Sequence, residues 1–105
     1  MDKLAGLINE LEKIDPIFHD MASIDKLKDA LAGYVNNLIT NDFEKLLRIL
    51  YRIDVSEIKL KNLLKENTGQ DAGVIIATLI IERQLQKIKT RDQLKKNSNN
   101  NETEW

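Results

Sequence analysis

The stretch from Val74 to Ile81 constrains the fold of this chain more than any other. It is apolar on nearly every side, with only Thr78 interrupting it. Its β-branched residues would suit a strand, but Asp71 is a good helix cap and a helical pattern continues through residues 82–88. A helix that is apolar all round must be surrounded by others. We therefore predict an all-α fold, a compact bundle of roughly four to five helices around this central part of a C-terminal helix over residues 72–94.

Upstream, apolar residues at three-and-four spacing predict two further helices. The first covers about residues 3–14 and is ended by Pro16, because proline disfavours helix at the residue before it. Ser23 is a good N-cap for the second, whose apolar seam runs to Leu38. Gly33 lies in the middle of that helix, where it marks either a close helix crossing or a merely tolerated glycine.

Two capping patterns divide the middle of the chain. Asn41 with Glu44 resembles a capping box, which predicts a third helix from there to about Ile53. Asp54 with Glu57 forms a similar pair and predicts a fourth helix after a sharp corner. We expect the apolar residues of the fourth helix to form its buried side: Ile58, Leu60, Leu63 and Leu64.

The end of the chain has a different composition. Residues 96–104 contain no apolar side chain, so we predict one helical domain over 1–95 and a disordered polar tail over 96–105. Trp105 is either an idle exposed residue or part of a short binding peptide.

Residue counts exclude several chemistries. The chain has no cysteine and one histidine, so thiol chemistry and sites that need paired histidines are excluded. No glycine-rich phosphate loop is present. His19 beside Asp20 suggests either a base or a surface histidine, and Asp25 with Asp29 suggests either a cation site or a solvated face. We favour the simpler interpretation of both and predict no catalytic residues, no metal, no cofactor and no enzyme activity.

Charge is unevenly distributed along the chain. Residues 1–54 hold ten acids and seven bases, whereas residues 55–105 hold seven acids and nine bases. The excess collects in the C-terminal half of the last helix, which makes this segment a candidate partner surface: Arg83, Lys87, Lys89, Arg91 and Lys95. Such a surface suits a solvated helix end, an acidic protein partner, or nucleic acid.

A second candidate surface lies at the corner between the third and fourth helices. Its candidate contacts are Tyr51, Arg52, Asp54, Glu57 and Glu82. A charged pair is expected to brace the corner against the last helix, either Arg52 with Glu82, or Arg83 with Asp54 or Glu57. The alternative is a partner-binding notch with Tyr51 exposed.

Residues 42–91 include the strings Phe-Glu-Lys-Leu at position 43, Leu-Tyr-Arg-Ile-Asp-Val-Ser-Glu at position 50 and Ile-Ile-Glu-Arg-Gln-Leu-Gln-Lys-Ile at position 80. With these strings the segment resembles a family of small uncharacterised bacterial all-helical proteins. The resemblance implies a bacterial setting and transfers no functional residue.

These observations lead to one functional expectation and one alternative. We expect a non-enzymatic protein–protein interaction or scaffold module that binds an unknown protein or forms a homodimer. The alternative is a nucleic-acid-associated protein that uses the basic C-terminal helix. The sequence shows no signal-peptide core and no apolar run near the roughly twenty residues of a membrane span, so we expect a cytoplasmic protein without a membrane partner.

Overall fold

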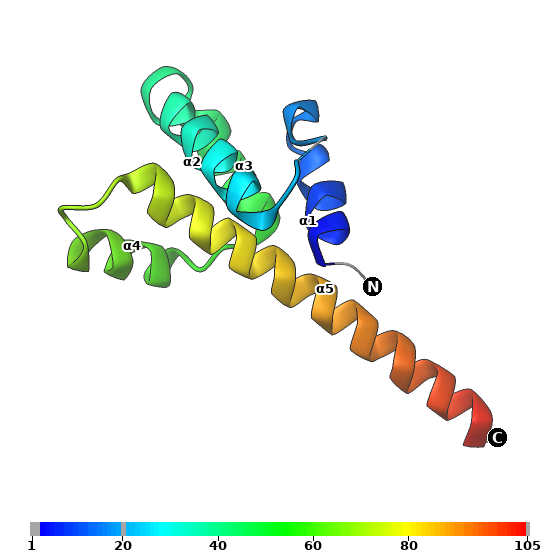
Figure 1. Cartoon of the computed structure of the whole chain (residues 1–105). Helices are drawn as coiled ribbons and strands as arrows, with labels where there is room; N and C mark the ends of the chain where they lie inside the picture. The colour runs from blue at the N-terminus through cyan, green and yellow to red at the C-terminus, as the bar shows by residue number, and fades with distance from the viewer. Residues whose placement is uncertain (1–2, 20, 105) are drawn as a thin grey trace.

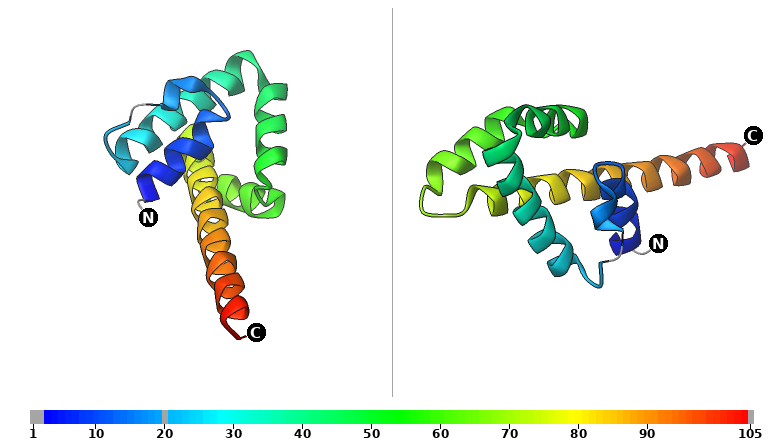
Figure 2. Two further views of the ribbon diagram at one scale, coloured as in Figure 1. Left: turned by 90° about the vertical axis from the view of Figure 1, so that its right-hand side faces the viewer. Right: turned by 90° about the horizontal axis from the view of Figure 1, so that it is seen from above.

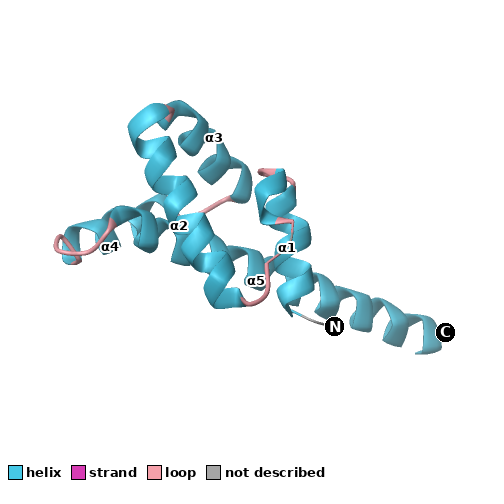
Figure 3. Cartoon of the chain, turned by 45° about the horizontal axis from the view of Figure 1, so that its top comes forward, coloured by secondary structure: helices cyan, strands magenta, loops and turns pink. Residues whose placement is uncertain are grey.

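The computed structural model describes the backbone of residues 3–19 and 21–104 and the side chains of these residues up to 94. The predicted all-α fold is confirmed, and the described part contains no strand (Figure 1, Figure 3). Its elements are α1 (Lys3–Glu12), the 3-10 turn η1 (Pro16–Phe18), α2 (Ile24–Asn41), α3 (Phe43–Ile53), α4 (Glu57–Glu66) and α5 (Ala72–Glu104).

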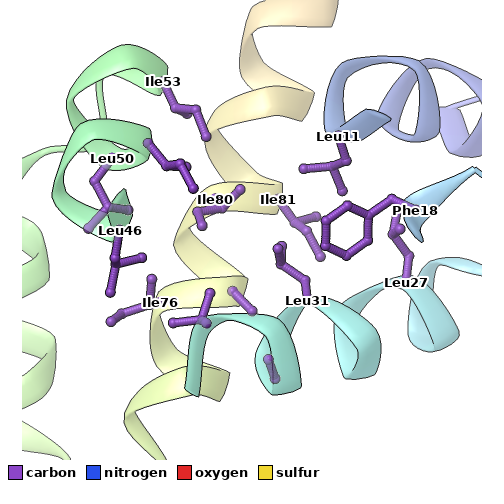
Figure 4. Close-up of a cluster of buried hydrophobic side chains, with 14 of the residues drawn as sticks. Leu11, Phe18, Leu27, Leu31, Leu46, Leu50, Ile53, Ile76, Ile80 and Ile81 are labelled. Carbon is purple, nitrogen blue, oxygen red and sulfur yellow. The ribbon is translucent and has the colours of Figure 1, made fainter. Parts of the chain in front are cut away.

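Helix α5 is the axis of the bundle, as the apolar segment predicts. Helices α1, α2, α3 and α4 all contact it, and the packing of α2 on α5 is the most extensive. Ile76, Ile80 and Ile81 extend from α5 into a core that α1, η1, α2 and α3 complete (Figure 4). Ala77 and Ile80 are almost fully buried, whereas Val74 is 38% exposed and Thr78 is half-buried. The other helices therefore cover most sides of the segment.

The C-terminal half of α5 projects beyond the bundle (Figure 2). The molecule measures 55 × 31 × 23 Å, and its radius of gyration of 15.8 Å exceeds the value of about 13 Å typical of a compact domain of this length. The predicted helix end near Leu94 was wrong, because α5 continues to Glu104. No glycine or proline interrupts residues 82–104, and these are the residues that stop helices most strongly. The side chains of residues 95–105 lie outside the described part, so the predicted disorder of the tail stays a prediction.

Two helix caps differ from the sequence prediction. Helix α2 runs through Asn41, and Asp42 caps α3 by accepting a hydrogen bond from the Lys45 amide at 3.2 Å. Ser56, and not Asp54, caps α4, accepting from the Lys59 amide at 3.2 Å. In both places a neighbouring side chain satisfies the free amides of the first turn.

The side of α4 that was predicted to be buried is only partly covered, although Leu60 does pack against the core. No residue of α4 is buried, and Ile58 is 75% exposed. Leu60, Leu63 and Leu64 are only half-buried, because α4 packs against α5 and forms no comparable contact with the other helices. Helix α4 therefore lies at the edge of the bundle (Figure 1).

The close helix crossing lies at Gly73 and not at Gly33. A Cβ atom at Gly73 would lie 2.5 Å from the backbone oxygen of Ala32 and from the side chain of Asn36, whereas Gly33 has nothing within 4 Å. The Gly73 amide donates to Asn36 Oδ1 at 3.1 Å and to the predicted cap Asp71 at 2.8 Å. Asn36 Nδ2 in turn donates to Asp71 Oδ2 at 3.0 Å. Asn36 thus ties the middle of α2 to the beginning of α5.

The two glycines give a matched test of this crossing. We expect Gly73→Ala to lower the free energy of unfolding by about 1–3 kcal/mol, because the added methyl group forces α2 away from α5. Gly33→Ala should instead raise it by about 0.5–1 kcal/mol, because alanine favours an exposed helix interior. Urea unfolding followed by circular dichroism measures both, and equal effects of the two substitutions would contradict the assignment.

Candidate functional site

The corner between α3 and α4 is braced by Arg83. Asp54 ends α3 in the left-handed conformation, with φ of 66°. Arg83 Nε donates to the Asp54 carbonyl at 3.1 Å, and Arg83 Nη2 donates to the Asp54 carboxylate at 3.2 Å. One guanidinium therefore holds both the backbone and the side chain of the strained residue, which is the geometry that arginine provides and lysine does not. This is one of the pairs proposed from the sequence.

The other corner residues have different partners. Glu82 pairs with Lys59 of α4 at 3.5 Å rather than with Arg52, and Glu57 pairs with Lys61 within α4 at 3.1 Å. The Glu82 pair connects α4 to α5 beside a hollow of about 390 Å³, which we call the corner hollow. Tyr51 does not line this hollow and is 90% exposed.

Three of the predicted basic residues form one row along α5, which we call the basic row: Arg83, Lys87 and Arg91. The row lines an outer hollow of about 360 Å³ with Glu10 and Thr90. Arg91 Nη2 contacts Glu10 Oε1 at 2.8 Å, which joins α5 to α1. Lys89 is exposed and lines neither the outer hollow nor the corner hollow. The Lys95 side chain lies outside the described part.

An inner hollow of about 340 Å³ adjoins the outer one where α1, α3 and α5 meet. Its lining residues are Glu10, Lys13, Ile14, Arg52, Ile53, Gln84 and Lys87. Gln84 is only 4% exposed and is the one buried polar side chain among those described. Its Oε1 accepts no hydrogen bond, which is costly for a buried carbonyl oxygen.

Glu10 is the shared acid of the two hollows. It contacts Lys13 at 3.3 Å as well as Arg91. Burial alone would raise the pKa of Glu10, but hydrogen bonds and charge from Arg91 and Lys13 outweigh burial and lower the pKa below its ordinary value of 4.5. Glu10 therefore stays ionised at neutral pH.

Helix α3 carries an exposed apolar row on the side that the core leaves uncovered. The row consists of Phe43, Leu47 and Tyr51, spaced four residues apart, and their exposed fractions are 54%, 50% and 90%. Residues four apart lie on one helix face. The apolar face of α3 is therefore wider than the surface that α2 and α5 bury.

His19 is exposed and lies beside the carboxylate of Glu12. Its Nδ1 lies 2.9 Å from Glu12 Oε1, and its proposed neighbour Asp20 lies outside the described residues. Asp25 and Asp29 are both exposed. The part of the chain that the structure describes contains no group of three potential metal ligands.

Sequence reasoning missed Glu10, Lys13 and Gln84. Nothing in the sequence connects Glu10 with Arg91, because the two lie 81 residues apart. Gln84 did leave a signal, since it lies four residues after Ile80 and four before Ile88, in the apolar stripe of α5. A polar residue at such a core position indicates a special environment.

Comparisons with known proteins return no match: no family model fits the chain, and no curated protein or solved structure is similar to it. The resemblance over residues 42–91 therefore stays an expectation. Each helix in the described part of the chain is too short or too polar to span a membrane.

The ion pairs of Glu10 predict a pH-dependent stability. A carboxyl whose pKa is lowered by folding stabilises the protein above its ordinary pKa, and this stabilisation is lost as the pH falls through the folded-state pKa. We expect Glu10→Gln to destabilise the protein by up to about 1 kcal/mol at pH 7. The difference from wild type should shrink as the pH falls below 4.5.

Urea unfolding between neutral and acid pH measures this difference. Glu66→Gln is the control, because Glu66 is exposed and forms no ion pair within the described part of the chain. It should change the stability at pH 7 by less than about 0.5 kcal/mol. A Glu10→Gln deficit that stays constant down to about pH 3 would show that the ion pairs do not cause it.

Proposed function

We propose that this protein is a non-enzymatic interaction module that pairs with a second copy of itself through α3. The observation that carries the proposal is the apolar row of α3, in which Phe43, Leu47 and Tyr51 are each at least half exposed. Exposed apolar residues are common singly, but a contiguous row on one helix face is typical of an interaction surface.

The spacing of the row suits an antiparallel, two-fold symmetric pair. In such a pair each residue meets its symmetry counterpart across the axis. With Leu47 on the axis, Leu47 packs against the same residue of the second copy, and Phe43 packs against Tyr51 at both ends. This arrangement places the two aromatic residues of each row in mixed pairs, which contribute more than their buried area alone.

The charges beside the row support the same partner. Glu44 and Arg48 are exposed, lie on the same edge of the row, and form no ion pair within the described part of the chain. In the antiparallel pair, Glu44 of one copy and Arg48 of the other lie almost level along the helix axes. They lie on the edges of the two helices that face each other, so that Glu44 of each copy approaches Arg48 of the other. A surface whose own charges complement each other under two-fold symmetry favours a second copy over an unrelated partner.

The corner has a supporting role in this proposal. Arg83 fixes Asp54 directly after α3, so the end of the apolar row is held to the bundle. The structural and the partner-binding interpretations of the corner are therefore compatible. The basic row supports the nucleic-acid alternative less well, because Arg83 and Arg91 are engaged with Asp54 and Glu10.

Substitution in the row tests the pairing. We expect wild type to form a weak dimer, with Kd in the micromolar range, because one helix face gives a small interface. Leu47→Glu should abolish the dimer, since it puts two carboxylates together on the symmetry axis. Ile58→Glu is the matched control on α4 and should leave the dimer intact. Sedimentation velocity measures the oligomeric state, circular dichroism confirms folding, and a wild type that stays monomeric at millimolar concentration refutes the proposal.

Charge reversal tests the orientation of the two copies. We expect Arg48→Glu to weaken the dimer about tenfold, because it would face Glu44 of the second copy. The double variant Glu44→Arg/Arg48→Glu should recover the wild-type Kd, because both ion pairs return with reversed polarity. Sedimentation equilibrium gives the three constants. A double variant no tighter than Arg48→Glu would contradict the antiparallel arrangement.

A further inference from the structure

The corner between α3 and α4 has a backbone conformation that its residues do not favour. The Asp54 amide donates to the Tyr51 carbonyl at 3.2 Å, and the Val55 amide donates to the Leu50 carbonyl at 3.1 Å. This is the Schellman pattern, whose left-handed residue is usually glycine because a side chain is costly there. Asp54 takes that place with φ of 66° and is the only non-glycine residue with a positive φ in the described part of the chain. The corner is therefore strained, and the brace from Arg83 holds it closed.

The sequence across the corner has the pattern of one uninterrupted helix. Seven residues span almost two helical turns, so residues seven apart lie on nearly the same face. Leu46 and Ile53, which are buried on α3, are followed at this spacing by Leu60 of α4. Tyr51 of the exposed apolar row is followed in the same way by Ile58. Residues 54–56 include no glycine or proline, so a straight helix over residues 43–66 would keep both apolar faces in register.

Helix α4 is coupled more firmly to α5 than to the rest of the bundle. It has no buried residue, and within the described part of the chain α5 is the element that it contacts extensively. Lys59 of α4 pairs with Glu82 of α5 at 3.5 Å, and residues 67–71 connect the two helices directly. When the corner straightens, α4 and α5 therefore move together as one unit.

Straightening of the corner removes α5 from the core of its own chain. Ile76, Ile80 and Ile81 are buried against the other helices (Figure 4), and a single chain cannot expose them without losing most of its core. A second copy restores these contacts, because its own α5 fits the same surface of α1, α2 and α3. The contacts of the corner are not restored, because Asp54 then lies within a helix. The strain at Asp54 therefore favours such an exchange, and the brace from Arg83 opposes it.

We propose that the corner is a hinge through which two copies of this chain exchange α4 and α5. Each copy opens at residues 54–56, forms one helix over residues 43–66 and places its α5 in the core of the other copy. Short connections under strain are typical hinges for an exchange of this kind. Asp54 and Arg83 set the balance between the closed monomer and the exchanged dimer. The proposal does not depend on pairing through α3, because the existing core contacts hold the exchanged dimer together.

Substitutions at Asp54 test the hinge in the Leu47→Glu background, which removes pairing through α3. Asp54→Gly and Asp54→Ala remove the same carboxylate, but glycine tolerates the left-handed conformation whereas alanine favours a continuous helix. After refolding from urea at high chain concentration, we expect the ratio of dimer to monomer to be at least about tenfold higher for Asp54→Ala than for Asp54→Gly. Size-exclusion chromatography with light scattering measures this ratio. Equal ratios, or an Asp54→Ala chain that stays monomeric, would overturn the proposal.

Isotope-filtered NMR distinguishes the exchange from any other dimer. The dimer of Leu47→Glu/Asp54→Ala is refolded from equal amounts of carbon-13-labelled and unlabelled chains. In the closed form the Ile88 side chain lies against Gly6, where a Cβ atom would be 3.1 Å from Ile88 Cδ1. We expect nuclear Overhauser effects between the Ile88 methyl groups of a labelled copy and the Gly6 α-protons of an unlabelled copy. A dimer in which this contact arises only within one copy contradicts the hinge.

Arg83→Gln is a second variant that decides the question if Asp54→Ala fails to fold. It removes the brace and leaves Asp54 in place, so in the Leu47→Glu background it should also raise the ratio of dimer to monomer. Lys87→Gln is the matched control, because Lys87 lies one turn along the same row of α5 and forms no ion pair within the described part of the chain. Equal ratios for Arg83→Gln and Lys87→Gln would refute the hinge. The comparison of wild type with Leu47→Glu alone reports separately on pairing through α3.

Discussion

The crossing of α2 over α5 at Gly73 is the contact on which the rest of the fold depends. It brings the backbone of Ala32 so close that no side chain fits at position 73, and it buries the apolar segment that begins there. The hydrogen bonds from Asn36 to Asp71 and Gly73 fix the crossing point along both helices. Helix α3 packs on both α2 and α5, and α1 and α4 each pack on α5 as well. The inner hollow lies where α1, α3 and α5 meet.

The sequence predicts those elements of the fold that rest on periodic burial. The segment from Val74 to Ile81 indicates a surrounded helix because nearly every side is apolar, and the other helices bury most of it, although Val74 is partly exposed. The same reasoning fails for α4, where Ile58 and the leucines show an amphipathic pattern. A pattern shows which face of a helix is apolar, but not whether another helix covers that face. Likewise, the sequence does not distinguish Gly33 from Gly73. Only the path of α2 across α5 determines which of the two glycines lies against the backbone of another helix.

The candidate site was less predictable because it is built from contacts between distant parts of the chain. The sequence suggested Arg83 with Asp54, since a charged pair at a corner limits the possible partners, and the structure contains that pair. The sequence did not predict the pair of Arg91 with Glu10. Predicting it requires knowing that α1 packs on the C-terminal half of α5. Gln84 is the intermediate case. Its place in an apolar stripe is visible in the sequence, whereas the missing hydrogen-bond partner is visible only in the structure. A residue that departs from the burial pattern of its helix in this way is expected at functional or strained sites.

The basic row shows why charge alone does not define a surface. Arg83 and Arg91 connect α5 to the corner and to α1, so their charge is largely balanced by Asp54 and Glu10. Lys87 lies between them and forms no ion pair in the described part of the chain. Replacing the whole row would remove two supports of the fold and one free charge at once, and lost binding would then have two explanations. Replacing Lys87 alone removes only the free charge. A loss of binding caused by replacing Lys87 is therefore easier to attribute to binding itself, because Lys87 contributes no ion pair to the described part of the fold.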